Sequence, residues 1–208
     1  MHNYHTFIIQ YNVYKLRKLF ILIFVLIIPV LTISKSKPET SADNFYELKK
    51  INQIVIKLIK DRDIGTLSKY AHPKKGIMFS PYSDLKNNDN QIIGKKDMVK
   101  TYEKNEELVW GEYDRTGTRI LLTFDNYFDR FIYDMDFIEY NLNYDSIMGI
   151  GNTLENINSV FPNARSVEYY VPGTEKYEYT DWKSLRLLYE MYKGKYYLVA
   201  VVHNEWTI

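Results

Sequence analysis

Histidine and cysteine set the limits on the chemistry that this chain can perform. The sequence contains four histidines and no cysteine, so disulfides, thiolate metal sites and a cysteine nucleophile are excluded. His2 and His5 precede a long apolar run, which leaves His72 and His203 for the rest of the chain. No HExxH zinc motif and no GxSxG nucleophile motif is present. We therefore expect no catalytic residue, no metal and no cofactor. His72 is predicted to cap a backbone group in a turn, and His203 to end a strand.

Carboxylates are numerous enough to leave one hydrolytic mechanism open. Asp and Glu together number 26, and Asp134 and Asp136 would share one face of an extended segment. A glycosidase needs two acids about 5–9 Å apart, one of them held in its protonated form. A small cell-wall hydrolase with a carboxylate pair is therefore the alternative function.

Aromatic side chains favour binding over catalysis. The chain has 20 Tyr, 10 Phe and 3 Trp, and their rings can stack on sugars or anchor a peptide partner. Most of them should form the core of a domain that has no disulfide. Tyr177, Tyr179 and Trp182 follow Gly173 in a polar loop, so we expect them to be exposed contact residues. The remaining candidates for ligand or partner contact are His72, His203 and Trp206.

The overall charge says little about a partner. Lys and Arg number 27 against 26 acidic residues, so no basic excess indicates nucleic-acid binding. The sequence therefore favours a non-enzymatic ligand-binding or protein-interaction module, with a cell-envelope protein or a glycan as its partner.

An apolar run near the N-terminus predicts export. Residues 19–33 are apolar apart from Thr32 and follow Lys15, Arg17 and Lys18. As a helix the run would extend about 22 Å, less than the bilayer core of about 30 Å. A cleaved signal peptide and a retained membrane anchor both stay open. We expect residues 1–33 to be this leader, 34–43 a polar tether and 44–208 one extracytoplasmic domain, anchored at the cell surface or secreted.

The domain should begin with helices. Apolar residues recur at helical spacing over residues 45–59, while several lysines and Asn52 lie on the opposite face. Asp63 is placed to cap a second, short helix. Further on, residues 94–104, 125–133 and 153–161 have helical patterns.

Strands dominate the second half. A hairpin is predicted around Gly117, and strands are predicted over residues 76–79, 167–171, 184–192 and 196–203. Arg186 and Glu190 alternate with apolar residues, which predicts that one face of the sheet is wetted. The simplest architecture is α+β, with N-terminal helices packed on a curved antiparallel sheet.

Two motifs carry a resemblance to a known family. The motif His72-Pro73 followed by Phe79-Ser80-Pro81-Tyr82, and a C-terminal His203-x-x-Trp206-Thr207-Ile208, are similar to an exported bacterial family of lipoproteins and secreted proteins. The likeness covers most of residues 45–208 and implies a bacterial, extracytoplasmic protein. No activity is assigned to that family, so the likeness implies no catalytic residue. Its members carry a lipidated cysteine, which this chain lacks. A weaker likeness to nuclear transport factor 2-like domains implies a cone-like fold.

Overall fold

The computed structural model describes residues 41–86 and 89–207. The predicted leader at residues 1–33 and most of the predicted tether lie outside the described residues. Within the described part of the chain, no helix combines the length and the apolar character needed to cross a bilayer.

Helix α2 (Ser41–Lys60) follows the apolar stripe seen in the sequence. Leu48, Val55 and Ile59 are buried on one side, as predicted. Asn52 was predicted to lie on the polar face of the helix. This prediction is wrong, because its side chain is fully buried. Its Nδ2 donates to the Tyr169 hydroxyl at 2.7 Å, and the Tyr189 hydroxyl donates to its Oδ1 at 3.0 Å. These two bonds satisfy a buried amide and join the helix to the sheet.

Four short elements follow α2. Helix α3 (Ile64–Tyr70) starts where predicted, since the side chain of Asp63 accepts a hydrogen bond from the Thr66 amide at 2.9 Å. Strands β1 (Ile77–Ser80) and β2 (Gln91–Ile93) then pair antiparallel, and helix α4 (Met98–Lys104) comes next.

The predicted hairpin is confirmed. Strands β3 (Leu108–Glu112) and β4 (Arg119–Leu122) pair antiparallel, and Gly117 in the turn has φ +63°. The helical pattern after it becomes α5 (Phe124–Tyr127), which continues as a π-helix, η1 (Phe128–Ile132). A 3-10 turn, η2 (Phe137–Glu139), then leads into the sheet.

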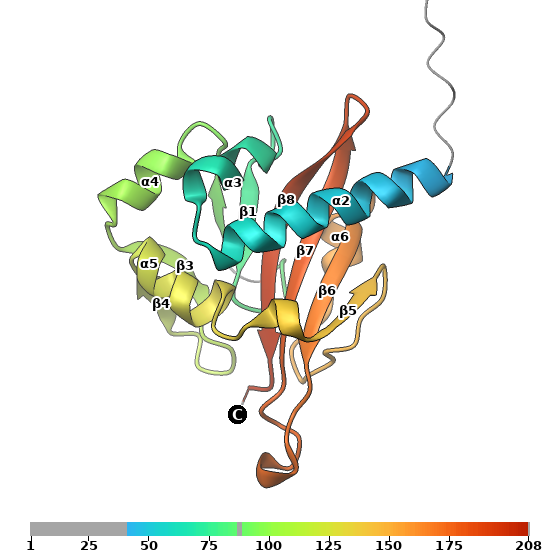
Figure 1. The fold of residues 1–208 in the computed structure, drawn as a ribbon. Helices are drawn as coiled ribbons and strands as arrows, with labels where there is room; N and C mark the ends of the chain where they lie inside the picture. The colour runs from blue at the N-terminus through green and yellow to red at the C-terminus, as the bar shows by residue number, and fades with distance from the viewer. Residues whose placement is uncertain (1–40, 87–88, 208) are drawn as a thin grey trace, which may run out of the picture. The chain divides into compact units, whose positions relative to one another are not determined.

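The main sheet has six strands in the order β2-β1-β8-β7-β6-β5. Its second half is built from β5, β6, β7 and β8, which cover Asn141–Tyr144, Arg165–Val171, Lys183–Tyr192 and Lys195–Glu205. All neighbouring strands run antiparallel except β1 and β8, which are parallel. Helix α2 lies across one face of this sheet (Figure 1). The α+β class is thus confirmed.

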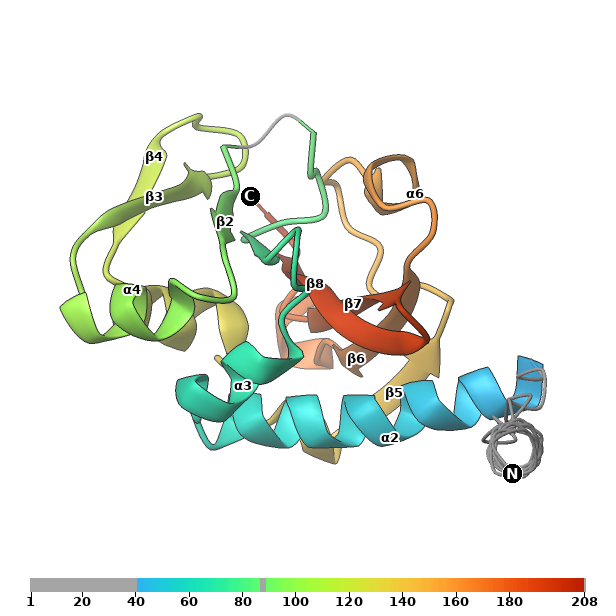
Figure 2. The same ribbon diagram turned by 90° about the horizontal axis from the view of Figure 1, so that it is seen from above.

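The face of the sheet toward α2 is filled by aromatic rings. Phe79 of β1 contacts Trp110 and Phe124 edge-on, and Trp110 stacks on Tyr127 with ring centroids 4.0 Å apart. These side chains are buried and belong to the main hydrophobic core. Seen from above, α2 and α3 lie on one side of the sheet and α6 (Ile157–Val160) on the other (Figure 2).

The second face of the sheet is also covered, so the predicted wetted face is wrong. Arg186 and Glu190 are buried, because the segment between β5 and β6 packs over this face with Ile157 and Phe161. Helix α6 is also much shorter than the predicted helix over 153–161. Thr153 is in contact with the β3–β4 turn and lies outside the helix.

Candidate binding site

A pocket of about 210 Å³ opens beside the β3–β4 turn. It is built by three segments: the chain after β1, the end of β3 with its turn, and the loop that precedes α6. The lining residues are Tyr82, Asp84, Glu112, Tyr113, Asp114, Arg115, Gly117 and Thr153. The lining has three carboxylates, those of Asp84, Glu112 and Asp114, and one guanidinium, that of Arg115. This excess of negative charge favours the binding of a positively charged group.

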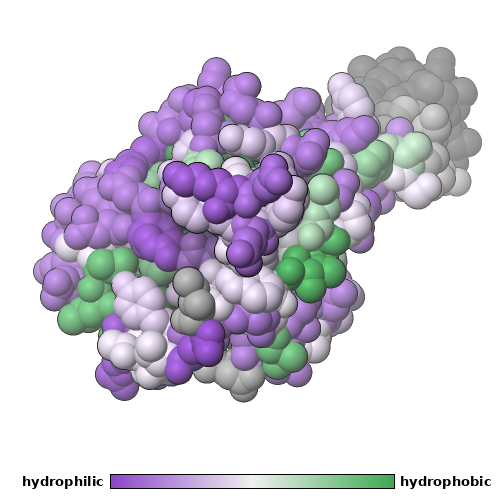
Figure 3. All heavy atoms as spheres, turned by 90° about the horizontal axis from the view of Figure 1, so that it is seen from below, coloured by the Kyte–Doolittle hydropathy of each residue, from purple (hydrophilic) through white to green (hydrophobic). Residues whose placement is uncertain are grey.

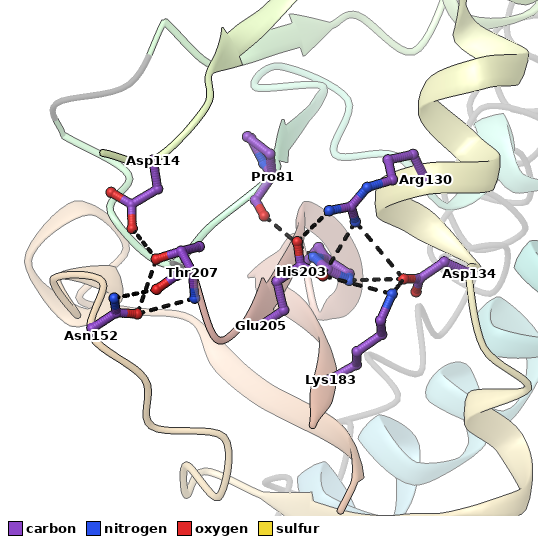
Figure 4. Close-up of polar contacts among 9 residues, drawn as sticks. All are labelled: Pro81, Asp114, Arg130, Asp134, Asn152, Lys183, His203, Glu205 and Thr207. Atoms are coloured by element: carbon purple, nitrogen blue, oxygen red, sulfur yellow. Dashed lines mark hydrogen bonds and ion pairs between the residues drawn. The ribbon is translucent and has the colours of Figure 1, made fainter. Parts of the chain in front are cut away.

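Asp114 is held in place by hydroxyl groups from distant segments. Thr207 Oγ1 donates to Asp114 Oδ2 at 2.5 Å, and Thr153 Oγ1 donates to the same oxygen at 3.0 Å. The backbone amide of Thr207 donates in turn to Asn152 Oδ1 at 3.2 Å, as Figure 4 shows. The carboxylate is therefore fixed by the C-terminal residues and by the loop before α6, and it needs no rearrangement to accept a ligand donor.

Tyr82 forms the inner wall of the pocket and remains a neutral phenol at physiological pH. Its side chain is buried, and this burial raises the pKa of Tyr82 to about 12. The nearby carboxylate of Glu205 acts in the same direction, while Arg130 opposes it. The hydroxyl is thus available as a hydrogen-bond donor but not as a base.

A charged cluster lies behind this wall, at the end of β8. His203 Nδ1 is 3.3 Å from the Pro81 carbonyl oxygen, and His203 Nε2 is 3.4 Å from Asp134 Oδ2 (Figure 4). Lys183 forms an ion pair with Asp134 and lies 3.6 Å from Glu205 Oε2.

Arg130 completes this cluster from η1. Its NH1 donates to Glu205 Oε2 at 3.3 Å and lies 4.0 Å from Asp134 Oδ2. Burial alone would raise the pKa of Asp134, but His203 and Lys183 outweigh that effect and hold its pKa below the usual value. The carboxylate is therefore ionised and paired.

Asp134, His203 and Glu205 bring three potential metal-ligand atoms within 4.8 Å of one another. His203 Nε2 and Asp134 Oδ1 are buried and have no hydrogen-bond partner among the described residues. However, Lys183 and Arg130 already balance the two carboxylates, so a divalent cation would add two uncompensated positive charges. The cluster fits an internal ion network better than a metal centre.

The predicted contact residues Tyr177 and Tyr179 are exposed, at 53% and 64%. They belong to the loop between β6 and β7, which contains the short 3-10 turn η3 (Glu175–Tyr177) and projects from the end of the sheet (Figure 1). Asp181 closes this loop, since its carboxylate accepts from the Thr174 amide at 2.6 Å and from the Thr174 hydroxyl at 2.8 Å. The two rings are presented by an ordered loop.

The predicted exposure of Trp182 is wrong. Its side chain is only 5% exposed, because the ring lies under the loop that contains Gly149 and Gly151 and near the ring of Tyr170. A Cβ atom on Gly149 would come within 2.7 Å of the Trp182 ring. Trp206 is 41% exposed and lies at the same end of the sheet.

The two histidines lie at opposite ends of β8. The His72 amide bonds to the Leu198 carbonyl near the start of the strand, whereas His203 is near its end. The predicted cap at His72 is confirmed, since its Nδ1 accepts from the amides of Lys74 and Lys75 at 3.2 and 3.0 Å. No site can therefore use both histidines.

The carboxylate pair considered from the sequence does not form. Asp134 points into the charged cluster, while Asp136 is exposed and accepts from Lys60 at 2.7 Å and from the Tyr133 hydroxyl at 2.6 Å. The three carboxylates of the pocket were not singled out from the sequence. Only the turn around Gly117 indicated that Asp114 would be presented at a bend.

Most of the hydrophobic side chains visible on the face seen from below stand apart, separated by hydrophilic ones (Figure 3). This surface favours polar recognition over burial of a broad apolar patch. No family model, curated protein or solved structure matches this chain.

Proposed function

We propose that this chain is an exported, envelope-associated and non-enzymatic module that binds a partner through its outer surface. The filling of the α2-facing side of the sheet by aromatic rings is the observation that carries the proposal. Because these rings pack in the buried core, recognition through the outer surface is favoured over a ligand enclosed on that side. The apolar run at residues 19–33 supports export.

The carboxylate-lined pocket is the proposed recognition element. Glu112 and Asp114 face an opening of about 210 Å³, which is large enough for one amino or guanidinium group of a peptide or an amino sugar. The neutral phenol of Tyr82 would add a hydrogen-bond donor beside them. We infer that the partner presents a basic group to this pocket.

A pair of lysine peptides tests this proposal. The full chain is titrated calorimetrically with a tetralysine peptide and with the same peptide acetylated on its side-chain amines. Binding is expected for the charged peptide alone, weakened about tenfold or more by Glu112→Gln or Asp114→Asn. Glu103→Gln removes an exposed acid from α4 and serves as the control. Equal affinity for both peptides, or equal weakening by the control, would contradict the proposal.

A cell-wall hydrolase remains the second candidate, because the same pocket holds several carboxylates. Catalysis would require one of these acids to stay protonated at neutral pH. Release of reducing ends from cell-wall glycan by the full chain, abolished by Glu112→Gln, would establish turnover. Binding of the charged peptide without any such release would support the module.

Within the α+β class, we propose a cone-like domain of the nuclear transport factor 2 type. It is supported by helices α2 and α3 on one face of a six-stranded sheet, and by the parallel placement of the first strand beside the last. An experimental structure that shows a flat sheet would contradict it.

A further inference from the structure

Lysines gather at the end of the sheet opposite the pocket. We define the basic face by Lys69, Lys74, Lys75, Lys95, Lys193 and Lys195, which come from α3, the turn before β1, the start of the α4 segment and the β7–β8 turn. All of them are exposed except Lys95, which is half-buried. Two acidic residues act on this set: Glu190 pairs with Lys75 at 2.5 Å, and Lys69 helps to lower the pKa of Asp63.

Side-chain contacts show that several of these lysines share one surface. Lys95 Nζ donates to the Lys69 carbonyl at 2.8 Å and lies 5.8 Å from the ring of Tyr197. Lys74 and Lys193 lie over the ring of Tyr192, at 5.8 and 5.6 Å from its centroid. Positive charges from three separate segments therefore meet around two neighbouring tyrosines.

The two tyrosines give this face an amphipathic floor. Tyr192 and Tyr197 are half-buried, with ring centroids 6.4 Å apart, and both rings contact His72. Tyrosine beside lysine is the combination that suits the boundary between water and lipid headgroups. The chain as a whole is nearly neutral, with 27 basic and 26 acidic residues, so this concentration of charge is local.

The short length of chain between α2 and the predicted leader points to the occupant of this face. Figure 1 shows α2 beginning on the same half of the molecule as the β7–β8 turn. Only residues 34–40 separate Ser41 from the apolar run, and a fully extended chain of that length reaches at most about 25 Å. A domain tethered so closely to a bilayer must lie next to its headgroups.

We propose that the basic face docks on the anionic headgroups of the membrane that holds the leader. Each lysine near an anionic surface favours association by about fivefold, and the attraction fades within a Debye length as salt is added. This inference rests on the proposed membrane placement of the chain and adds the lipid chemistry and the orientation. The carboxylate pocket would then point away from the bilayer.

Energy transfer to labelled lipid tests this orientation. Because the chain has no cysteine, a single fluorophore can be placed at Met191→Cys beside the basic face or at Thr116→Cys in the β3–β4 turn. The full chain is reconstituted into vesicles of phosphatidylcholine alone, or with about 30% phosphatidylglycerol, each carrying a headgroup-labelled acceptor. Transfer from position 191 should rise strongly with the anionic lipid and exceed that from position 116.

Two matched variants identify the lysines responsible. The first replaces Lys69, Lys74, Lys193 and Lys195 by Gln, which leaves the Lys75–Glu190 pair intact. The control replaces four exposed lysines elsewhere by Gln, namely Lys57, Lys86, Lys104 and Lys176. The gain in transfer should vanish in the first variant and in about 0.5 M salt, and should persist in the control.

The outcomes separate this inference from the proposed function. If the full chain fails to float with either kind of vesicle, the membrane placement itself is wrong. If it floats but energy transfer from position 191 is the same with neutral and with anionic lipid, the docking inference is overturned. Tight binding of soluble polyphosphate through the same lysines, without dependence on lipid charge, would assign the face to a phosphate polymer and overturn the lipid assignment.

Discussion

Asp134 and His203 face each other inside the molecule, with Oδ2 of the carboxylate 3.4 Å from Nε2 of the ring. Asp134 follows η1, whereas His203 belongs to β8. Lys183 of β7 contacts the same carboxylate. This contact therefore ties the segment after the π-helix to two central strands, directly behind the wall of the proposed pocket.

Asp134→Asn should destabilise the protein in a pH-dependent way. At pH 7 we expect the free energy of unfolding to fall by about 3 kcal/mol, because Lys183 and His203 lose a buried charged partner. A carboxyl group whose native pKa lies below its unfolded value stabilises the fold above that unfolded value and loses this effect as the pH falls through the native pKa.

Urea unfolding at pH 7 and at pH 3 measures this effect. The difference between wild type and Asp134→Asn should be full at pH 7 and should shrink below about pH 4. Asp89→Asn, at an exposed position, should match the wild type at both values. A difference that is constant across this range would show that the carboxylate charge is not the cause.

Substitution of the buried Trp182 should lower stability, whereas substitution of the exposed Tyr177 or Tyr179 should not. Trp182→Ala removes a buried ring beneath Gly149 and Gly151 and is expected to cost about 3 kcal/mol of unfolding free energy. Tyr177→Ala and Tyr179→Ala remove exposed rings and should change stability by less than about 0.5 kcal/mol. Thermal unfolding of the three variants provides the measurement. A large loss for either tyrosine would mean that the loop serves the fold.

Gly173→Ala should disrupt the loop between β6 and β7. A Cβ atom on Gly173 would lie 2.4 Å from the Tyr179 carbonyl oxygen, so the backbone of the loop must move apart. Faster cleavage by trypsin after Lys176 is the expected result. Gly65→Ala is the matched control, since its nearest contact is 3.6 Å away and alanine suits a helix, which should make α3 about 0.5–1 kcal/mol more stable. Equal cleavage of both variants would refute the crowding at Gly173.

His72 should titrate below the ordinary histidine range. Burial lowers the pKa of His72 below 6.5, Glu190 opposes the shift, and Lys75 and Lys74 add to it. The unfolded chain therefore binds the proton more readily, so this group stabilises the fold above about pH 6.5 and the contribution is lost as the pH falls below that value.

NMR of the imidazole carbon-bound protons follows this titration directly. The midpoint for His72 should lie below 6.5 and should move upward in Lys74→Gln, because one positive neighbour is removed. Lys57→Gln, which changes an exposed lysine of α2, should leave it unchanged. A wild-type midpoint above 6.5 would contradict the buried position of the ring.

Local patterns predicted most of the elements. The stripe over residues 45–59, the Asp63 cap and the hairpin around Gly117 each depend on neighbours within a few residues, and all three are present in the structure. The same holds for the long strands β7 and β8. The predictions that proved wrong concern polar residues whose partners are distant in the sequence.

Arg186 illustrates such a failure. Alternation along β7 indicated a wetted face, yet the Arg186 guanidinium is buried and donates to Glu168 at 2.9 Å and to the Gly149 carbonyl at 2.6 Å. The helical pattern over 153–161 failed similarly, since the hydroxyl of Thr153 bonds to Asp114 instead of remaining in a helix. A charged residue looks the same in sequence whether water or a distant carboxylate satisfies it.

The amino-acid sequence by itself determined the α+β class, the order of the elements, the absence of cysteine chemistry and the apolar run at the N-terminus. Only the tertiary structure decided which side chains share a surface: the carboxylates around Asp114, the ion network at His203 and the lysines around Tyr192. Helix and strand signals repeat over a few residues, whereas these clusters join segments that come together only when the sheet forms.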